Sequence, residues 1–211
     1  MKYKHIIWDY NGTILDDTQM VLDILNIMLS RRNMQTKTIE EYREIFDFPI
    51  YDYYKRVGFD FEIESFDDLA DEFMELYDAA LPECKLREGT EEFMKRLDSE
   101  GYKQSVLTAG RESSVVKEIR DLRLNKYIKK ITGLHNNKAE SKVILAAKHL
   151  NKIKTDAADI LFIGDTTHDK IVANEIGCDC VLLAGGHQSI ERLKAVNDMV
   201  AGGLKDLKKY L

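Results

Sequence analysis

Residues 6–13, Ile-Ile-Trp-Asp-Tyr-Asn-Gly-Thr, join a short apolar run to an acidic residue and a flexible turn. The apolar run that ends at Trp8 predicts a buried strand, and the Asn-Gly pair predicts a turn directly after it. Asp9 therefore ends a strand and directs its carboxylate into a crevice. Two residues on, Asn11 has a backbone carbonyl that can bind a metal, but its side chain cannot exchange a proton as a carboxylate does.

The composition is typical of an ordinary globular protein with one sizeable core and a small accessory domain. The chain has 211 residues, a formal net charge of −6 and 44% hydrophobic residues. Because no basic tract balances this charge, nucleic acid and anionic membranes are unlikely partners on electrostatic grounds, and a small molecule is favoured. No run has the pattern of a signal peptide or the length of a membrane span, so we expect a cytoplasmic protein, monomeric or homodimeric. We expect three reduced cysteines and no zinc site at Cys84, Cys178 and Cys180.

Apolar runs of strand length alternate with stretches of helical period, chiefly after residue 85. Thr90, Ser113 and Ser141 are predicted to begin helices, and Gly177 to end another. This alternation predicts an α/β fold with a doubly wound parallel sheet. The expected strands are 5–9, 104–108, 128–132, 160–164 and 180–184.

The stretch between the first two strands, residues 16–85, reads only as helices. Capping signatures at Thr38 and Ser65 predict two helix starts. We therefore expect a core formed by 1–15 and 86–211, with 16–85 inserted as an all-helical cap domain. The apolar residues at helical spacing that support this expectation are Val21, Leu22, Leu25, Met28, Leu29, Phe66, Leu69, Ala70, Phe73 and Tyr77.

Chemistry is expected at the carboxyl ends of the strands, where open parallel sheets bind ligands. Asp9 and Thr108 end the first two strands, Lys142 stands at a helix entrance, and Asp165 and Asp169 follow the fourth strand. Three clustered carboxylates require a cation, and hard oxygen ligands suit Mg²⁺. The lysine would balance a dianionic substrate.

These residues resemble, in order, spacing and strand context, the motifs of the haloacid dehalogenase superfamily. The matching elements are Asp9-Tyr10-Asn11-Gly12-Thr13, Thr108, Lys142, and Gly164-Asp165 with Asp169. The resemblance covers the whole chain and is strongest to phosphatases with a helical cap, such as the phosphoglycolate phosphatase-like group. It implies a Rossmann-like core and magnesium-dependent hydrolysis of a small phosphorylated metabolite.

The resemblance also implies roles for the acidic residues. Asp9 would be the nucleophile that takes the phosphoryl group as an aspartyl phosphate. Asp9, Asp165 and Asp169 would hold Mg²⁺ directly or through water, with the backbone carbonyl of Asn11 as a further ligand. The simpler alternative for Asp165 and Asp169 is a helix cap.

The remaining motif residues have competing interpretations. Thr108 would donate its hydroxyl to a phosphoryl oxygen, although it could be only a local cap. Lys142 would steady the phosphate and the nucleophile; Lys138 competes for this role, because many relatives carry the lysine just before a proline, which this chain lacks. His168 could touch a ligand or be a solvated turn residue. Residues 185–187, Gly-Gly-His, could bring backbone close to the site or form a plain turn.

Asn11 departs from the family pattern. The phosphatases normally have an aspartate there, which protonates the leaving oxygen and then activates the hydrolytic water. Losing such a group costs on the order of 10² to 10⁴ in rate. Activity is therefore expected to be weak on alkyl phosphates and less affected on acyl or aryl phosphates, and Asn11→Asp is expected to raise turnover.

Two alternative functions remain open. One is a non-catalytic or regulatory relative that binds phosphate. The other is a hydrolase of carbon–phosphorus bonds, which would need a cap lysine such as Lys37 or Lys55. A metal-free dehalogenase is disfavoured by the acidic residues of the fourth motif. Within the cap, Arg43, Tyr51 and Lys55 are the candidates to face substrate.

Overall fold

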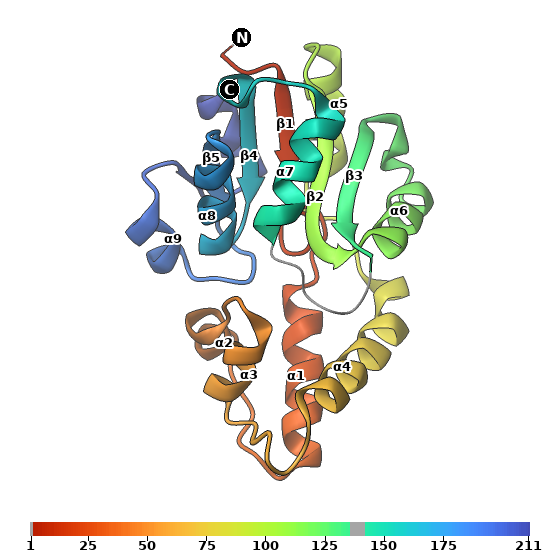
Figure 1. The fold of residues 1–211 in the computed structure, drawn as a ribbon, viewed down its shortest axis with the longest axis vertical. Helices are drawn as coiled ribbons and strands as arrows, with labels where there is room; N and C mark the ends of the chain where they lie inside the picture. Colours follow the sequence, from red (N-terminus) through yellow and green to blue (C-terminus); the bar gives the residue numbers. More distant parts are fainter. Residues whose placement is uncertain (1, 136–141) are drawn as a thin grey trace.

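The computed structural model describes residues 2–135 and 142–211 and contains a six-stranded sheet in which every pair of neighbouring strands is parallel (Figure 1). The strand order is β3-β2-β1-β4-β5-β6, so β1 lies near the centre and the chain winds outward in both directions. The doubly wound parallel sheet expected from the sequence is confirmed. The strands are β1 (His5–Trp8), β2 (Lys103–Arg111), β3 (Ile128–Leu134), β4 (Ile160–Gly164), β5 (Asp179–Leu183) and β6 (Val200–Ala201).

Helices cover both faces of the sheet, which explains why its strands are apolar throughout rather than alternating. Neighbouring residues of one strand enter different cores: Ile6 packs with α5, α6 and the C-terminal turn η4, whereas Ile7 packs with α7, α8 and α9. The helices and 3₁₀ turns of this part of the chain are α5 (Thr90–Ser99), α6 (Glu112–Asp121), η2 (Leu124–Lys126), α7 (Lys142–Ile153), η3 (Ala157–Asp159), α8 (Thr167–Ile176), α9 (Ile190–Val196) and η4 (Leu204–Tyr210).

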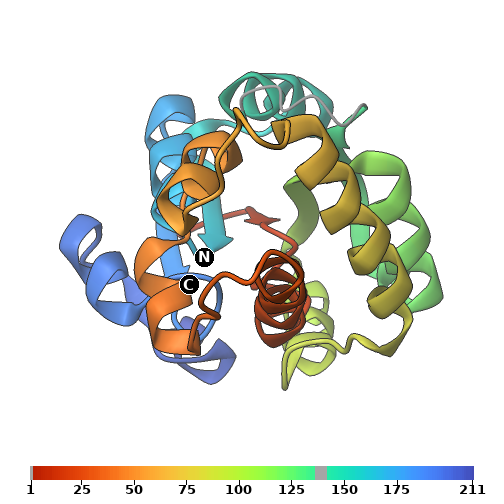
Figure 2. The ribbon, with the colours of Figure 1, turned by 90° about the horizontal axis from the view of Figure 1, so that it is seen from below.

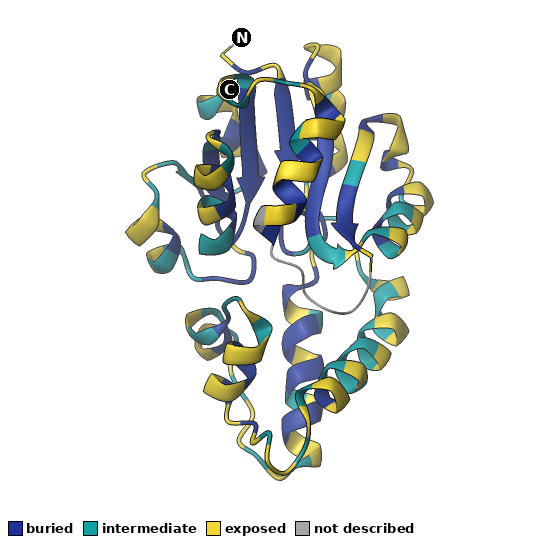
Figure 3. Cartoon of the chain, viewed as in Figure 1, coloured by how far each residue is buried: buried dark blue, intermediate teal, exposed yellow. Residues whose placement is uncertain are grey.

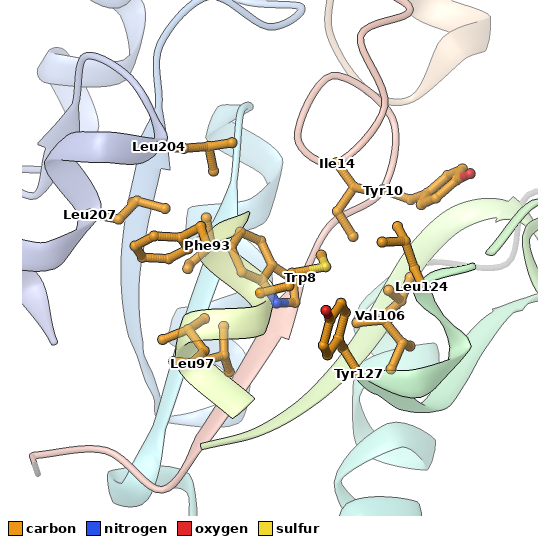
Figure 4. Packing of buried hydrophobic residues seen from close by; sticks show 14 of the residues in the cluster. Trp8, Tyr10, Ile14, Phe93, Leu97, Val106, Leu124, Tyr127, Leu204 and Leu207 are labelled. Carbon is orange, nitrogen blue, oxygen red and sulfur yellow. The ribbon is translucent and has the colours of Figure 1, made fainter. Parts of the chain in front are cut away.

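Trp8, the last residue of β1, anchors the first of these cores (Figure 4). Its ring meets Phe93 of α5 edge-to-face, with ring centroids 6.2 Å apart. Its indole nitrogen donates to Gln104 Oε1 at 3.2 Å, so the buried polar atom is satisfied. Trp8 therefore fixes the end of β1 from which Asp9 extends.

The residues after β1 form four helices that lie beyond the carboxyl ends of the strands (Figures 1 and 2). Helix α1 is the most deeply buried of them, and Figure 3 shows much of it in the colour of buried residues. These helices share their own apolar cluster, formed by residues between Met20 and Ala80. They are α1 (Thr18–Arg31), α2 (Ile39–Ile45), α3 (Ile50–Val57) and α4 (Phe66–Ala80), followed by the turn η1 (Leu81–Glu83).

Helix starts predicted at Thr38, Ser65 and Thr90 are confirmed, the first two with a side-chain cap and the third without one. Thr38 forms a capping box with Glu41 at the start of α2, and Ser65 accepts from the backbone of Asp68 at the start of α4, as expected. Helix α3 was not predicted, and it begins after Pro49 without a side-chain cap.

The strand predictions fell short at the ends of elements. β2 runs past Thr108 to Arg111, which pairs with Leu134 of β3 beyond a register shift, and α6 consequently begins at Glu112 rather than Ser113. β6 is two residues long and carries no recognisable pattern. Among the described residues, no helix combines the length and hydropathy needed to cross a bilayer.

Candidate active site

The structure brings the predicted acidic residues together at the carboxyl ends of β1 and β4. Asp9 directly follows β1, Asp165 directly follows β4, and Asp169 lies in the first turn of α8. One carboxylate oxygen from each residue lies within 4.8 Å of the others, and all three residues are buried. The strand ends thus build one compact acidic cluster from parts of the chain that are 156 residues apart in sequence numbering, from Asp9 to Asp165.

Lys142, the first residue of α7, supplies the positive charge of the cluster. Its Nζ donates to Asp9 Oδ1 and to Asp169 Oδ1, at 2.5 Å in each case. Its side chain is only 4% exposed. Although burial opposes the charged form, the two carboxylates raise the pKa of Lys142 above its ordinary value. The competing candidate Lys138, and the predicted helix start Ser141, lie outside the described residues.

Asp169 caps α8, which is one of the two roles that the sequence left open, and it also contacts Lys142. Its Oδ2 accepts hydrogen bonds from the Thr166 hydroxyl at 2.8 Å, from the Thr166 N–H at 3.0 Å and from the Asp165 N–H at 3.2 Å. This oxygen caps the start of α8, while Oδ1 faces Lys142. Burial opposes ionisation, but Lys142 and Thr166 together hold the pKa of Asp169 below its ordinary value.

Asp165 is held by a close approach of backbone on both sides. Oδ1 accepts from the Thr13 hydroxyl at 2.8 Å, and Oδ2 accepts from the backbone N–H of His187 at 2.7 Å. A Cβ placed on Gly12 or Gly186 would come within 2.3 and 2.2 Å of Asp165 Oδ2, respectively. The glycines of the first motif and of the 185–187 turn are therefore required for Asp165 to sit where it does.

The donor set fits a divalent cation. Three carboxylates and one ammonium leave a formal charge of −2 in a buried site. Burial raises the pKa of Asp9 to about 8 even against the attraction of Lys142, and burial also raises the pKa of Asp165. The ionised cluster is therefore short of positive charge, and carboxylate oxygens are the ligands that Mg²⁺ prefers.

Thr108 lies in β2, and its side chain contacts the backbone two residues further on. Its Oγ1 accepts from the backbone N–H of Gly110 at 2.9 Å, and the same hydroxyl can donate its hydrogen elsewhere. A Cβ placed on Gly110 would lie 3.3 Å from Thr108 Oγ1 and 3.6 Å from Asn11 Oδ1. The hydroxyl of Thr108 and the side-chain oxygen of Asn11 therefore both lie close to Gly110, near the carboxyl end of β2.

Asp17 is the residue of this region that the sequence analysis missed. Its buried carboxylate accepts from the side-chain amide of Asn11 and from the backbone of Gly12, at 2.7 Å each, and from the Tyr77 hydroxyl at 3.2 Å. His187 Nε2 lies 3.2 Å from Asp17 Oδ1, the oxygen that also accepts from Gly12. The sequence analysis did not single out Asp17, because its partners Tyr77 and His187 lie far away in the sequence.

Asp17 and His187 form a buried ion pair. Burial disfavours both charges, yet His187 and the hydrogen bonds from Asn11 and Gly12 hold the pKa of Asp17 below its ordinary value. Burial likewise opposes a charged His187, but Asp17 raises the pKa of His187 to about 9. The Tyr42 hydroxyl, from α2, lies 2.7 Å from His187 Nδ1 and closes the pair on the cap side.

The cap residues singled out from the sequence lie in different places. Arg43 donates to the backbone carbonyls of Gly186 at 2.9 Å and Gly185 at 3.0 Å, so it reaches the loop beside Asp165. Lys55 lies over the ring of Tyr51, 4.5 Å from its centroid, rather than against the acidic cluster.

His168 and Lys37 complete the account of the candidates from the sequence. His168 stacks on Phe48 of the cap, with ring centroids 4.8 Å apart. The backbone of Lys37 exchanges hydrogen bonds with the side chain of Asn26 in α1. Within the described residues, the hydrogen bonds of Lys37 and the ring contacts of Lys55 do not involve the acidic cluster.

The chain matches the family model of haloacid dehalogenase-like hydrolases over residues 6–183. A curated protein of Caldanaerobacter subterraneus subsp. tengcongensis, named "Putative pyrophosphatase PpaX", is 24% identical over 200 residues, covering 92% of this chain and 87% of that protein. Among solved structures, a haloacid dehalogenase-like family hydrolase from Streptococcus pneumoniae superimposes with a TM-score of 0.84 at 17% identity, covering 99% of this chain and 98% of that one. A "predicted phosphatase" from Clostridium acetobutylicum gives 0.81 at 19% identity, covering 100% and 98%.

At these identities the solved structures show a shared fold, and the family itself rests on the sequence match. That match begins in β1 and ends with the last residue of β5, so it includes every strand end that contributes to the acidic cluster. The chain belongs to the haloacid dehalogenase-like hydrolase family.

Proposed function

We propose that this protein is a magnesium-dependent phosphatase-type hydrolase that acts on a small phosphorylated metabolite through an aspartyl phosphate on Asp9. One observation carries the proposal. The buried carboxylate of Asp9 lies 2.5 Å from the ammonium of Lys142 and shares a cluster with the carboxylates of Asp165 and Asp169. A nucleophile next to a fixed cation and a site for a second cation is suited to an anionic phosphoryl group.

In the first half-reaction, an oxygen of Asp9 forms a bond to phosphorus while the bond from phosphorus to the leaving group breaks. Lys142 is positioned to hold both Asp9 and a phosphoryl oxygen, and Thr108 can donate its hydroxyl to another. In the second half-reaction, water attacks phosphorus, the bond to Asp9 breaks, and inorganic phosphate leaves with the carboxylate regenerated. We call the space bordered by Asp9, Thr108 and Lys142 the phosphoryl pocket.

Magnesium would be held by Asp9, Asp165, Asp169 and the backbone carbonyl of Asn11. When bound, it would neutralise charge on the transferring oxygens. Hydrogen bonds within the protein orient the carboxylates: Thr13 and the backbone of His187 orient Asp165, and Thr166 orients Asp169.

We also propose the domain division on which substrate choice would depend, with a core of 1–15 and 86–211 and a cap of 16–85. The apolar cluster confined to the four cap helices supports it. Helices over the strand ends would exclude water from the phosphoryl pocket. Because one relative bears the name of a pyrophosphatase, phosphoanhydrides belong among the substrates to be tried.

The test is a panel of phosphoanhydrides and of acyl, aryl and alkyl phosphates, assayed with Mg²⁺ and with chelator on the wild type and Asp9→Asn. We expect turnover that requires Mg²⁺, an acid-stable mass increase of one phosphoryl group on the wild type during turnover, and loss of both in Asp9→Asn by about 10⁴-fold or more. Asp98→Asn, an exposed aspartate of α5, is the matched control and should behave as wild type. Activity that survives chelator or the loss of Asp9 would contradict the proposal.

A further inference from the structure

Asp17 occupies the N-cap position of α1 but does not cap it. No hydrogen bond joins its side chain to the first turn of that 14-residue helix, although aspartate is among the best capping residues. The carboxylate instead faces the first motif, where it contacts Asn11 and Gly12. Tyr77 and His187 contact it from other parts of the chain. It is 0% exposed. The helix therefore gives up a cap in order to place a carboxylate beside Asn11.

This arrangement determines which way the amide of Asn11 faces. Its Nδ2 donates to Asp17 Oδ2 and to the Tyr77 hydroxyl, at 2.7 Å each, so both amide hydrogens are used. A carboxylate can only accept, so the nitrogen must be the atom that faces Asp17. The oxygen consequently points away, toward the end of β2, where it lies 3.6 Å from a Cβ placed on Gly110.

We propose that Asp17 and Tyr77 are positioning residues that hold Asn11 as an acceptor-only group at the phosphoryl pocket, and that this restricts the site to phosphates whose leaving group departs as a stable anion. The inference rests on the proposed function and names the substrate class of the same site. It commits to phosphoanhydrides, acyl phosphates and aryl phosphates, and against simple alkyl phosphates.

The chemistry of the first half-reaction gives the reason. As the Asp9 oxygen bonds to phosphorus, the leaving group keeps the electron pair of the broken bond. A phosphate, carboxylate or aryl oxide is stable with that pair, whereas an alkoxide must receive a proton in the same step. Both amide hydrogens of Asn11 are donated to Asp17 and Tyr77. The side-chain oxygen of Asn11 can therefore accept a hydrogen bond from a hydroxyl or water, but Asn11 cannot give a proton to an alkoxide.

The same contacts change the expectation for Asn11→Asp. The new carboxylate oxygen would replace the nitrogen that now lies 2.7 Å from Asp17 Oδ2, so two acceptors would face each other without a hydrogen. Changing both residues, Asn11→Asp with Asp17→Asn, restores one donor and one acceptor with the direction reversed. The double variant then holds a carboxyl group at residue 11 whose second oxygen faces the phosphoryl pocket.

The first experiment measures kcat and KM on a series of phosphates of graded leaving-group basicity. We expect a steep fall in wild-type kcat as the leaving group becomes more basic, and a shallower fall in the double variant, with a gain of about 10²-fold on alkyl phosphates. Asn11→Asp alone should gain much less and melt at a lower temperature. Asp16→Asn, its exposed neighbour, is the matched control and should keep the wild-type profile. If Asn11→Asp alone equals the double variant in both rate and melting temperature, Asp17 does not position residue 11.

The second experiment reads the position of the amide without any substrate. In protein labelled with ¹⁵N at asparagine, Tyr77→Phe should shift the side-chain resonances of Asn11 and speed exchange of its amide hydrogens, while Asp16→Asn should not. Unchanged Asn11 resonances in Tyr77→Phe would overturn the positioning role. If these resonances respond as expected but the wild type hydrolyses no phosphate of the series, then the positioning stands and the proposed function fails.

Discussion

Two buried groups of polar side chains lie on the same sheet and differ in charge. The rim cluster, at the carboxyl ends of the strands, consists of Asp9, Lys142, Asp165 and Asp169. The histidine network lies between β1, β2, β3 and α7, and consists of His5, Ser105, Thr132 and His149. All eight residues are buried. Burial costs more free energy for the charged rim cluster than for the neutral histidine network, and the two groups offset that cost in different ways.

The histidine network is neutral, and its hydrogen bonds join its own residues; of its ring nitrogens, His5 Nδ1 has no partner among the described residues. Ser105 Oγ lies 2.7 Å from His5 Nε2 and 2.8 Å from His149 Nε2, and His149 Nδ1 lies 2.9 Å from Thr132 Oγ1. Burial lowers the pKa of His5 to about 4 and that of His149 to about 3. The rim cluster, in contrast, has a formal charge of −2 that the protein does not balance. A neutral network serves the fold, whereas an unbalanced charged one prepares the site for a cation and an anionic substrate.

Removing Lys142 should have the largest effect, because Lys142 supplies the positive charge of the rim cluster. Lys142→Met leaves three buried carboxylates without their cation, so we expect activity to fall by about 10³-fold or more and metal-free stability to fall by about 3 kcal/mol. Added Mg²⁺ should recover much of the stability by binding the folded state. Urea unfolding with and without Mg²⁺ measures this, with exposed Lys117→Met as the control. Equal Mg²⁺ stabilisation of both variants would contradict the charge argument.

Displacing Asp165 should have a smaller effect than removing Lys142, because only one carboxylate of the rim cluster moves. In Gly186→Ala the new Cβ would lie 2.2 Å from Asp165 Oδ2, so the carboxylate or the loop must move. Such overpacking costs about 1–3 kcal/mol, and a displacement of about 1 Å at a catalytic site can cost about 10²-fold in rate. We expect both losses in thermal melts and steady-state assays.

The same chain provides a matched control for this substitution. Gly203→Ala adds the same methyl group where nothing lies within 4 Å, so it should leave activity and melting temperature near the wild-type values. If Gly186→Ala behaved like Gly203→Ala, the close packing of the 185–187 turn against Asp165 would not matter for the site.

The sequence predicted the rim cluster better than the contacts around it, because the two depend on different information. Asp9 and Asp165 each end an apolar run, and parallel strands bring their carboxyl ends to one edge, so local pattern and topology suffice. Asp17 depends on His187, 170 residues away, and on Tyr77 in the cap. No periodicity encodes such contacts, so the sequence analysis did not single out Asp17.

The helices and strands also divide into those that local sequence patterns predict and those that depend on neighbouring elements. β1 and the capped helices α2 and α4 carry their own signals, whereas α3 starts without a side-chain cap. The edge strand β6 is held by two register pairs with β5, and the apolar run that contains it, residues 199–201, is too short to predict a strand. Where an element is defined by its neighbour rather than by its own residues, a single sequence does not predict it.

The histidine network makes the smallest prediction, which concerns acid stability. Because the folded-state pKa values of His5 and His149 lie below the ordinary 6.5, the unfolded chain binds protons that the folded protein does not. Their contribution to stability is complete above about pH 6.5 and is lost as pH falls toward 4 for His5 and 3 for His149. Each histidine should add a slope of about 1.4 kcal/mol per pH unit in this window.

Urea unfolding from pH 7 to pH 4.5 measures that slope. His149→Gln keeps a polar side chain at the position and removes one titrating group, so its slope should be smaller than that of wild type by about 1.4 kcal/mol per pH unit. His135→Gln changes an exposed histidine and should leave the slope unchanged. Because the rim carboxylates remain in all three proteins, their contribution cancels in the comparison. Equal slopes for His149→Gln and wild type would mean that the histidine network takes up protons without unfolding, and that it is not the neutral counterpart of the rim cluster.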